Sequence, residues 1–562
     1  MKPTPEQNQA IEAFLSLQSL KVNAFAGTGK TSTLQLMSKS DTRRGIYLAF
    51  NKSIASDAAR KFPSNVQALT SHSAAYRSVM NRGYSSEEMT GSLNVNALIE
   101  RLQLPPLDIP GGRSLSPRQH AYLVLQTLKR FTQSADIEIT SRLVPKPGVL
   151  AHENDASSLE EVRRSVSAIT RQLWQRMITP GNAAFPLGHD GYFKLWSLSK
   201  PRLTADYIFL DEAQDSNPAL LSVLADQSAQ IVYVGDRFQQ IYEWRGAVNA
   251  MERIETPLQL QLTQSFRFGP AIADVANSVL HLIDRSATVR GWPSIKSQIG
   301  CANPDTILTR TNASLIGYVL AAQSAGRSAC VVGGTQELKW MLDDVTRLKQ
   351  GRTGEHHEFF GYKNWAEVQE AVLRPEGEHL KTFVKIVDSY GEKTIINALS
   401  HTKADESEAD LVLSTAHKSK GREWSGVMLD DDFFEPYLVP ADEQSRNPKR
   451  LSGNSVSGPV DNKIYDYSQE EARLLYVAFT RAINALQIPR WCEAFFGIQQ
   501  TVSKLDLEPK LGQPVAAPKH ESAFPPDTEQ AYSQQPIQAP QKSIPWLWII
   551  IVAILVIMLL RR

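Results

Sequence analysis

The sequence predicts an α/β protein with two parallel-sheet lobes, each interrupted by a mostly helical insert. Short apolar or β-branched runs alternate with turn signals and helical stretches, which is the pattern of parallel α/β lobes. These runs also fall into two groups that are separated along the chain. Because 562 residues are too many for one hydrophobic core, about three or four domains are expected.

The first group of expected strands ends at turns that carry polar or glycine-rich segments. Its strands are residues 20–23, 45–50, 207–210 and 231–234, and the later group is residues 306–309, 411–414 and 426–429. The predicted parts are a first lobe (1–74 and 201–263) with a helical insert (75–200), a second lobe (264–334 and 406–500) with an insert (335–405), a disordered linker (501–543) and an anchor (544–562).

Composition narrows the functional class. Lys and Arg number 60 and Asp and Glu number 59, giving a net charge of +1. A protein that coats a duplex through bulk charge is strongly basic, so any nucleic-acid contacts are expected in a groove. The three cysteines are far apart and lack CxxC spacing, which argues against a disulfide framework, structural zinc or an iron–sulfur cluster.

The C-terminus carries an apolar run from residue 544 to residue 560, interrupted only by Pro545. Such a helix reaches about 25 Å, slightly less than a hydrocarbon core of about 30 Å. Trp546 and Trp548 at one end and the two final arginines at the other can close that gap. We therefore expect a single-pass transmembrane helix that binds a membrane through 544–560, with the rest of the chain cytoplasmic. A buried helix is the alternative.

Within the first insert, one amphipathic helix is well marked. Ser158 and Glu161 match a capping box, and apolar residues recur at helical spacing after them. Four arginines lie off that apolar stripe, and a solvated face is favoured over a nucleic-acid contact: Arg163, Arg164, Arg171 and Arg176.

A phosphate-binding loop follows the first expected strand and precedes a helix-forming run. Its nucleotide-binding residues are Ala26, Gly27, Thr28, Gly29, Lys30 and Thr31. Backbone N–H groups there are expected to surround a β-phosphate, with Lys30 reaching the β- and γ-oxygens and the Thr31 hydroxyl holding Mg²⁺. Ala24 stands where the usual pattern has glycine. An ordinary glycine-rich turn is the alternative.

Two acidic residues and one amide complete the expected hydrolytic side of this site. Asp211 and Glu212 leave an apolar strand, so Asp211 is expected to hold Mg²⁺ and Glu212 to orient or deprotonate the attacking water. An acidic helix cap is the alternative, plausible for the nearby Asp215 but not favoured for the pair. Gln239 follows another strand and is expected to sense the γ-phosphate; a surface glutamine is the alternative.

Two distant arginines, Arg267 and Arg481, are expected to stabilise charge that develops on the transferring phosphoryl oxygens. Arg267 lies at the start of the second group of strands and Arg481 near its end. If both reach across a cleft, nucleotide binding closes the lobes. For either arginine alone, a surface salt bridge is the alternative.

Aromatic residues beside polar or basic ones suggest single-strand contacts, because bases stack on rings regardless of sequence. Tyr242, Trp244 and Arg245 are the first candidates, with core packing as the alternative for the two rings. Contacts to the phosphodiester backbone are expected from Phe50, Asn51, Lys52, Thr70, His72, Thr415 and His417. Lone histidines are usually structural, so both histidines stay open.

The order of these motifs resembles that of the UvrD/Rep-type superfamily 1 DNA helicases, from about residue 4 to residue 490. Gln7 matches the family's adenine-reading glutamine, and Phe266 stands where the family has a tyrosine that stacks on adenine. Glu423 matches a nucleotide-contacting glutamate, and Arg310 with Asn312 matches a further motif. The segments 48–55 and 414–421 resemble the F-box DNA helicase subgroup, although no F-box is expected because the chain begins at the glutamine motif.

This resemblance implies two RecA-like lobes with ATP and Mg²⁺ between them. It also implies single-stranded DNA across both lobes, a preference for 3′ single-stranded tails, and 3′→5′ movement. Two other functions stay open: a translocase that strips proteins from DNA without unwinding it, and a membrane-bound nucleic-acid sensor in defence.

Overall fold

The computed structural model describes most of the chain, all of it within the compact unit Met1–Pro514. The described residues are 2–109, 113–145, 156–242, 249–301, 303–359, 362–373, 379–439, 455–460 and 463–500. Trp244, Arg245, the expected linker and the expected C-terminal anchor lie outside these residues. The expected α/β fold with two parallel sheets is confirmed.

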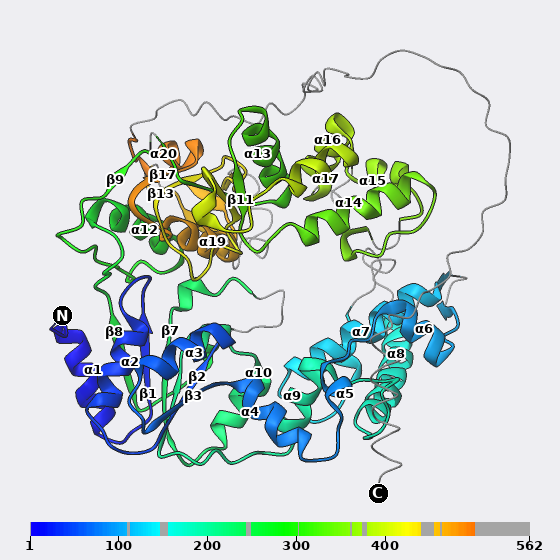
Figure 1. Ribbon diagram of the computed structural model, residues 1–562, viewed down its shortest axis with the longest axis horizontal. Helices are drawn as coiled ribbons and strands as arrows, with labels where there is room; N and C mark the ends of the chain where they lie inside the picture. Colours follow the sequence, from blue (N-terminus) through cyan, green and yellow to red (C-terminus); the bar gives the residue numbers. More distant parts are fainter. Residues whose placement is uncertain are drawn as a thin grey trace, which may run out of the picture. The chain divides into compact units, whose positions relative to one another are not determined.

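The first sheet has six strands, and every neighbouring pair is parallel (Figure 1). In spatial order these are β3 (Val66–Thr70), β2 (Gly45–Ala49), β6 (Tyr207–Leu210), β7 (Gln230–Gly235), β1 (Leu20–Ala24) and β8 (Leu258–Leu262). The inner strands β6 and β7 are buried throughout and read as continuous apolar runs, as expected for strands covered on both faces. The edge strand β8 alternates leucine and glutamine because only one of its faces is packed.

The second sheet also has six parallel strands. In spatial order these are β11 (Ala329–Val331), β12 (Leu411–Thr415), β10 (Thr306–Thr309), β13 (Trp424–Leu429), β17 (Ala482–Gln487) and β9 (Gln298–Ile299). Two small antiparallel sheets are also described. One, between β3 and β6 in the sequence, pairs β4 (Leu107–Ile109) with β5 (Arg113–Leu115), and the other, between β13 and β17, pairs β14 (Tyr437–Leu438) and β15 (Ser455–Ser457) with β16 (Ile464–Asp466).

Helices join the strands of the first sheet and fill the segment between β3 and β6. Those near the sheet are α1 (Pro5–Leu15), α2 (Lys30–Lys39), α3 (Lys52–Lys61), α10 (Pro218–Ala225) and α11 (Ala250–Arg253). Those between β3 and β6 are α4 (Ser71–Met80), α5 (Ser86–Thr90), α6 (Val95–Leu102), α7 (Pro117–Gln133), α8 (Ala156–Met177) and α9 (Gly188–Leu198). Figure 1 shows α5 to α9 beside the first sheet rather than across it.

The second sheet has its own helices, and four of them lie between β11 and β12 (Figure 1). The helices that pack on the sheet are α12 (Pro270–Ile283), α13 (Asn312–Ser324), α19 (Gln469–Phe479) and α20 (Arg490–Phe496). The other four, which we call the second insert, are α14 (Gln336–Lys349), α15 (Trp365–Ala371), α16 (Lys381–Tyr390) and α17 (Glu392–Ser400).

The expected capping box at Ser158 is wrong. Helix α8 begins at Ala156, two residues earlier, so Ser158 lies inside the first turn. Ser158 is fully buried there, and Val162 and Val166 on the same helix belong to the core of the first lobe. Packing of this apolar stripe therefore sets where the helix lies, and local capping chemistry does not.

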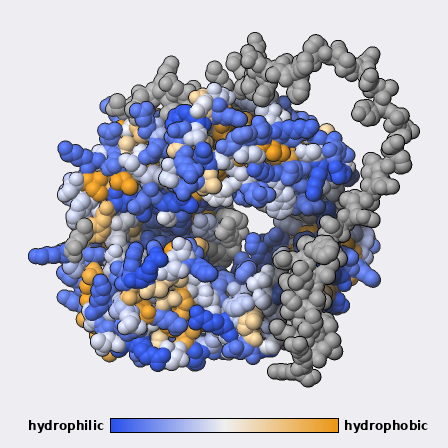
Figure 2. All heavy atoms as spheres, viewed as in Figure 1, coloured by the Kyte–Doolittle hydropathy of each residue, from blue (hydrophilic) through white to orange (hydrophobic). Residues whose placement is uncertain are grey.

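The expected membrane location is corrected by the helices themselves. Within the residues that the structure describes, no helix combines the length and the apolar character needed to cross a bilayer. The run 544–560, on which that expectation depended, lies outside them. On the face seen in Figure 2, hydrophilic residues dominate and hydrophobic residues form separate patches.

Candidate active site between the two sheets

The phosphate-binding loop joins β1 to α2 and depends on two glycines in the left-handed region. Gly27 has φ +71° and Gly29 has φ +76°. A Cβ atom on Gly27 would lie 2.5 Å from Ser265 Oγ and 2.6 Å from Arg267 Cβ. Glycine is therefore required both by the backbone conformation and by the close approach of the Arg267 segment. Phe266 N donates to Gly27 O at 2.8 Å, which ties that segment to the loop.

Lys30 and Thr31 begin helix α2 and face the acidic pair at the end of β6. Thr31 Oγ1 donates to Asp211 Oδ2 at 2.9 Å, and the buried Tyr47 hydroxyl donates to the same oxygen at 2.6 Å. Lys30 Nζ lies 3.6 Å from Glu212 Oε1. A hydroxyl and a carboxylate at this spacing are hard oxygen ligands, so the residues present fit a hydrated Mg²⁺ ion.

The two carboxylates have opposite electrostatic environments although they are neighbours. Burial and the Glu212 charge raise the pKa of Asp211 above its usual value. Burial also opposes ionisation of Glu212, but the positive charges of Lys30 and Lys420 outweigh it and lower the pKa of Glu212 to about 2. Glu212 is therefore ionised at every pH at which the protein is expected to work. Its backbone lies in the left-handed region, with φ +53°.

A chain of hydrogen bonds links the first sheet to Arg481 in the second lobe. Gln239 Nε2 donates to Asp236 Oδ2 at 2.7 Å, and Arg481 Nη2 donates to Gln239 Oε1 at 3.3 Å. Tyr476 Oη donates to Asp236 Oδ2 at 3.3 Å and accepts from Ala26 N at 3.0 Å. Tyr476 was not among the expected site residues because an aromatic residue in an apolar helix reads as core.

Arg481 is only 1% exposed, an unusual position for a guanidinium group. Burial, together with the nearby charge of Arg267, lowers its pKa to about 9. Backbone carbonyls of Val477 and Arg422 accept from it at 2.8 and 3.1 Å. The guanidinium group is therefore held in place by the second lobe while one of its nitrogens points at Gln239 of the first.

Arg267 lies beside the phosphate-binding loop and is also held by the second lobe. Its Nε donates to Glu423 Oε2 at 2.6 Å, and its Nη1 donates to Thr480 O at 3.0 Å. The structure therefore brings Lys30, Asp211 and both arginines to one place between the two sheets. Glu423 in this arrangement is a partner of Arg267.

The other side of the loop carries the expected adenine-binding residues. Gln7 is 5% exposed and donates to Thr33 Oγ1 at 3.1 Å. A Cβ atom on Gly29 would lie 3.4 Å from Gln7 Nε2 and 3.5 Å from the Phe266 ring. Trp292, which sequence analysis missed, packs on Phe266 with ring centroids 4.9 Å apart. Nothing in its local sequence marks it, because it lies after an irregular loop.

A buried ion pair that sequence analysis also missed joins the two lobes. Lys420 Nζ donates to Asp215 Oδ2 at 2.6 Å, and both side chains are less than 10% exposed. The second carboxylate oxygen of Asp215 is buried without a hydrogen-bond partner. Burial raises the pKa of Asp215 to about 6 in spite of the Lys420 charge. Asp215 is therefore an interlobe contact; in sequence it resembled a helix cap.

This pKa predicts a pH dependence of nucleotide hydrolysis. As pH falls through about 6, Asp215 takes up a proton and its charge attraction to Lys420 is lost, so Lys420 is held less firmly near Glu212. The turnover number of the wild-type protein should then decline below about pH 6, measured between about pH 5 and pH 8. Asp215→Asn should remove this inflection. An unchanged inflection in Asp215→Asn would assign it to another group.

Three expected nucleic-acid contacts lie together at a cavity of about 900 Å³ on the second lobe: Tyr242, Thr415 and His417. Tyr242 Oη donates to His417 O at 3.3 Å, so this ring from the first lobe reaches the end of β12. The Lys420 ammonium lies 5.1 Å from the Tyr242 ring centroid. Core packing, the alternative for Tyr242, describes only part of its environment, because the ring packs against the core but is only partly buried.

The remaining expected nucleic-acid contacts lie on the first lobe, and their side chains have different environments. Asn51 and Thr70 are helix N-caps, accepting from Ile54 N at 2.9 Å and Ser73 N at 3.1 Å. His72 stacks on Phe193 at 4.8 Å, and burial lowers its pKa. Lys52 is an exposed residue at the start of α3. Phe50 is 53% exposed and shares a cavity of about 250 Å³ with Thr31, Asp211 and Glu212.

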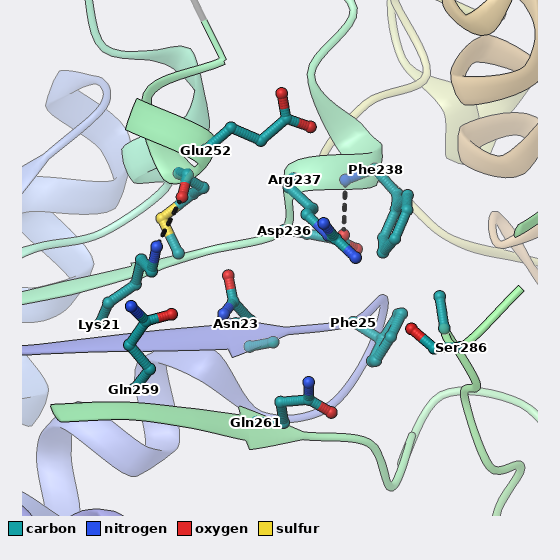
Figure 3. Close-up of a pocket in the computed structure, with 13 residues that line it drawn as sticks. Lys21, Asn23, Phe25, Asp236, Arg237, Phe238, Glu252, Gln259, Gln261 and Ser286 are labelled. Carbon is teal, nitrogen blue, oxygen red and sulfur yellow. Dashed lines mark hydrogen bonds between the residues drawn. The ribbon is translucent and has the colours of Figure 1, made fainter. Parts of the chain in front are cut away.

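A separate cavity of about 310 Å³ lies behind the phosphate-binding loop (Figure 3). Lys21 and Asn23 of β1 and two glutamines of β8 form one wall, and Lys21 Nζ donates to Met251 O at 3.0 Å. On the opposite side the rings of Phe25 and Phe238 stack with centroids 5.6 Å apart. This stack couples the start of the loop to the Asp236–Gln239 segment.

Comparison with known proteins gives two family matches. A family described as the UvrD/REP helicase N-terminal domain matches residues 194–255, and one described as the UvrD-like helicase C-terminal domain matches residues 343–491. The first match contains Asp211, Glu212 and Gln239, and the second contains Glu423 and Arg481.

Individual relatives extend the similarity along the chain. It is 31% identical over 527 residues to F-box DNA helicase 1 of Gallus gallus, covering 86% of this chain and 49% of that protein. It is 30% identical over 526 residues to F-box DNA helicase protein 1 of Schizosaccharomyces pombe, covering 86% and 57%. ATP-dependent DNA helicase PcrA of Leuconostoc citreum is 34% identical over 95 residues, covering 16% and 13%. The chain spans about half the length of the two F-box DNA helicases.

Proposed function

We propose that this chain, which belongs to the UvrD-like helicase family, is an ATP-dependent motor that moves 3′→5′ along single-stranded DNA and separates strands. The single observation that carries the proposal is the meeting of Lys30, Asp211, Arg267 and Arg481 beside one phosphate-binding loop. These residues lie on segments that flank the two parallel sheets, and we interpret each sheet with its helices as a RecA-like lobe. Such a site is built to respond to whether the lobes are closed.

Each residue has a role that its position supports. Lys30 would bind the β- and γ-phosphates, and Thr31 with Asp211 would hold Mg²⁺. When bound, that ion neutralises phosphate charge and keeps the triphosphate oriented. Glu212 is ionised and would accept a proton from, or orient, the attacking water. Gln7, Phe266 and Trp292 would enclose the adenine ring.

Coupling to DNA follows from the residues that cross between the lobes. Arg267 and Arg481 belong to the second lobe and would stabilise phosphoryl charge only when the lobes are closed. Lys420 is attached to the same segment as Thr415 and His417, which line the cavity expected to hold DNA. The nucleotide bound at the phosphate-binding loop would therefore change the position of the DNA contacts in the cavity. Tyr242 would stack on a base at this crossing point.

The proposal is tested by ATP hydrolysis titrated with single-stranded DNA, duplex DNA and RNA. Stimulation at least tenfold stronger by single-stranded DNA is expected, and Lys30→Ala should abolish it because the β- and γ-phosphates lose their cation. Strand displacement should occur on duplexes with 3′ tails and not on those with 5′ tails. Hydrolysis that no nucleic acid stimulates would overturn the motor function. Stimulation without displacement would instead identify a translocase.

A further inference from the structure

Tyr242, Thr415 and His417 line a cavity whose cationic side chains are already paired with carboxylates. Arg310 pairs with Glu471 at 2.6 Å, and Lys418 pairs with Glu337 at 3.0 Å. Arg422 pairs with Glu406. Within the residues that the structure describes, the positive charges of this cavity are therefore already neutralised by acidic side chains, although the cavity is proposed to hold a polyanion. At least one of these carboxylates must give way if a phosphate group is to be bound there.

The three pairs differ in how firmly the acid is held. The Arg310 guanidinium makes three hydrogen bonds with Glu471, and both side chains are mostly buried. Glu406, the partner of Arg422, also accepts from Trp424 Nε1 at 3.0 Å within the second lobe. The Lys418–Glu337 pair is different because its acid comes from helix α14 of the second insert. It is the pair that connects the insert to the end of β12.

The solvent exposure of the Lys418–Glu337 pair and the flexible stem of the lysine allow Lys418 to exchange Glu337 for another anion. The two side chains are 30% and 48% exposed, and pairs this accessible to solvent contribute little to stability. A lysine ammonium group on a flexible stem can turn from one anion to another. The stem passes over Gly333, where a Cβ atom would lie 3.3 Å from Lys418 Cδ. The absence of a side chain there leaves the stem room to move.

We propose that Lys418 is a further contact to the DNA backbone, and that Glu337 holds it in the DNA-free protein until a phosphodiester displaces the carboxylate. The inference rests on the proposed function, because it needs single-stranded DNA in this cavity. It assigns the second insert a role in setting DNA affinity through one carboxylate. Because Glu337 remains close by, each phosphate contact is weakened, which favours release as the strand moves.

Anisotropy of a labelled oligothymidylate, measured on the full chain over a range of salt concentrations, tests the inference. Glu337→Gln should bind about twofold to fivefold more tightly, because the competing charge is removed. Lys418→Ala should bind more weakly, and its slope of log affinity against log salt should be shallower by about 0.7, the value for one phosphate contact to a single strand. In the Lys418→Ala background, Glu337→Gln should change nothing.

Asp343→Asn is the matched control, because it removes the same charge from an exposed position on α14 that does not line the cavity. It should leave the affinity unchanged. Equal tightening by Glu337→Gln with and without Lys418 would overturn the inference, since Glu337 would then act through its general field. Affinity that does not respond to Glu337→Gln would also overturn it. Absence of any DNA binding by the wild-type protein would instead overturn the proposed function, and this inference with it.

Discussion

Arg481→Lys is expected to lower the turnover number of DNA-stimulated ATP hydrolysis by about a thousandfold, the scale at which an arginine contributes to phosphoryl transfer. Lysine keeps the positive charge but has a point-like ammonium group in place of a planar fork of donors. It cannot bond Gln239 and also satisfy the carbonyls of Val477 and Arg422. The loss should therefore fall on the chemical step.

Nucleotide binding should change much less in Arg481→Lys, by about tenfold or less, because Lys30 and the loop backbone are untouched. The measurements are kcat and KM for ATP, with binding of a non-hydrolysable analogue as a separate readout. Some loss of stability is expected from the two unpaired carbonyls, about 1–3 kcal/mol each at most, so Tm is recorded as well.

Arg285→Lys is the matched control for this prediction, because Arg285 is an exposed residue of the same lobe. It should leave kcat unchanged. A wild-type kcat in Arg481→Lys would remove Arg481 from the chemistry and leave it as a structural residue that joins α19 to β13. A parallel loss of analogue binding would mean that the pocket itself is disrupted.

Much of the fold could be predicted because the strands that carry the site are buried and apolar. Strands β6 and β7 are continuous apolar runs, and each ends in polar residues at the same edge of the sheet. Parallel topology then places Asp211 and Gln239 near the phosphate-binding loop. The start of α8 could not be predicted, because tertiary packing of its apolar stripe outweighed the local capping signal at Ser158.

The site was predictable where the residue type itself declares its chemistry, as with Lys30, the acidic pair and the two arginines. It was not predictable where a common residue acquires a role through a distant partner. Tyr476 reads as core in its helix, yet its hydroxyl group bonds both Ala26 N and Asp236. Lys420 pairs with Asp215 across 205 positions of sequence. Such pairs exist only after two lobes have folded and met.

The second large effect is expected from Glu212→Gln, which should reduce kcat for ATP hydrolysis by about a hundredfold to ten-thousandfold while ATP binding is retained. Gln has nearly the same shape, so it keeps the hydrogen bond with Gln214 available and tolerates the same backbone. It cannot accept a proton from water. Loss of the negative charge beside Lys30 should, if anything, strengthen binding of an anionic triphosphate.

The pH profile separates this role from a merely structural one. Because the pKa of Glu212 is about 2, its carboxylate stays ionised between about pH 5 and pH 8, so in an Asp215→Asn background the ratio of kcat with Glu212 to kcat with Glu212→Gln should be constant there. That background removes the Asp215 decline, which Glu212→Gln alone would shift because the Glu212 charge helps to raise the pKa of Asp215. Glu255→Gln, at an exposed position of the same lobe, should behave as wild type. If the ratio instead approached one as pH fell, Glu212 would be titrating in this range, and the cationic surroundings of Lys30 and Lys420 would not be holding it ionised.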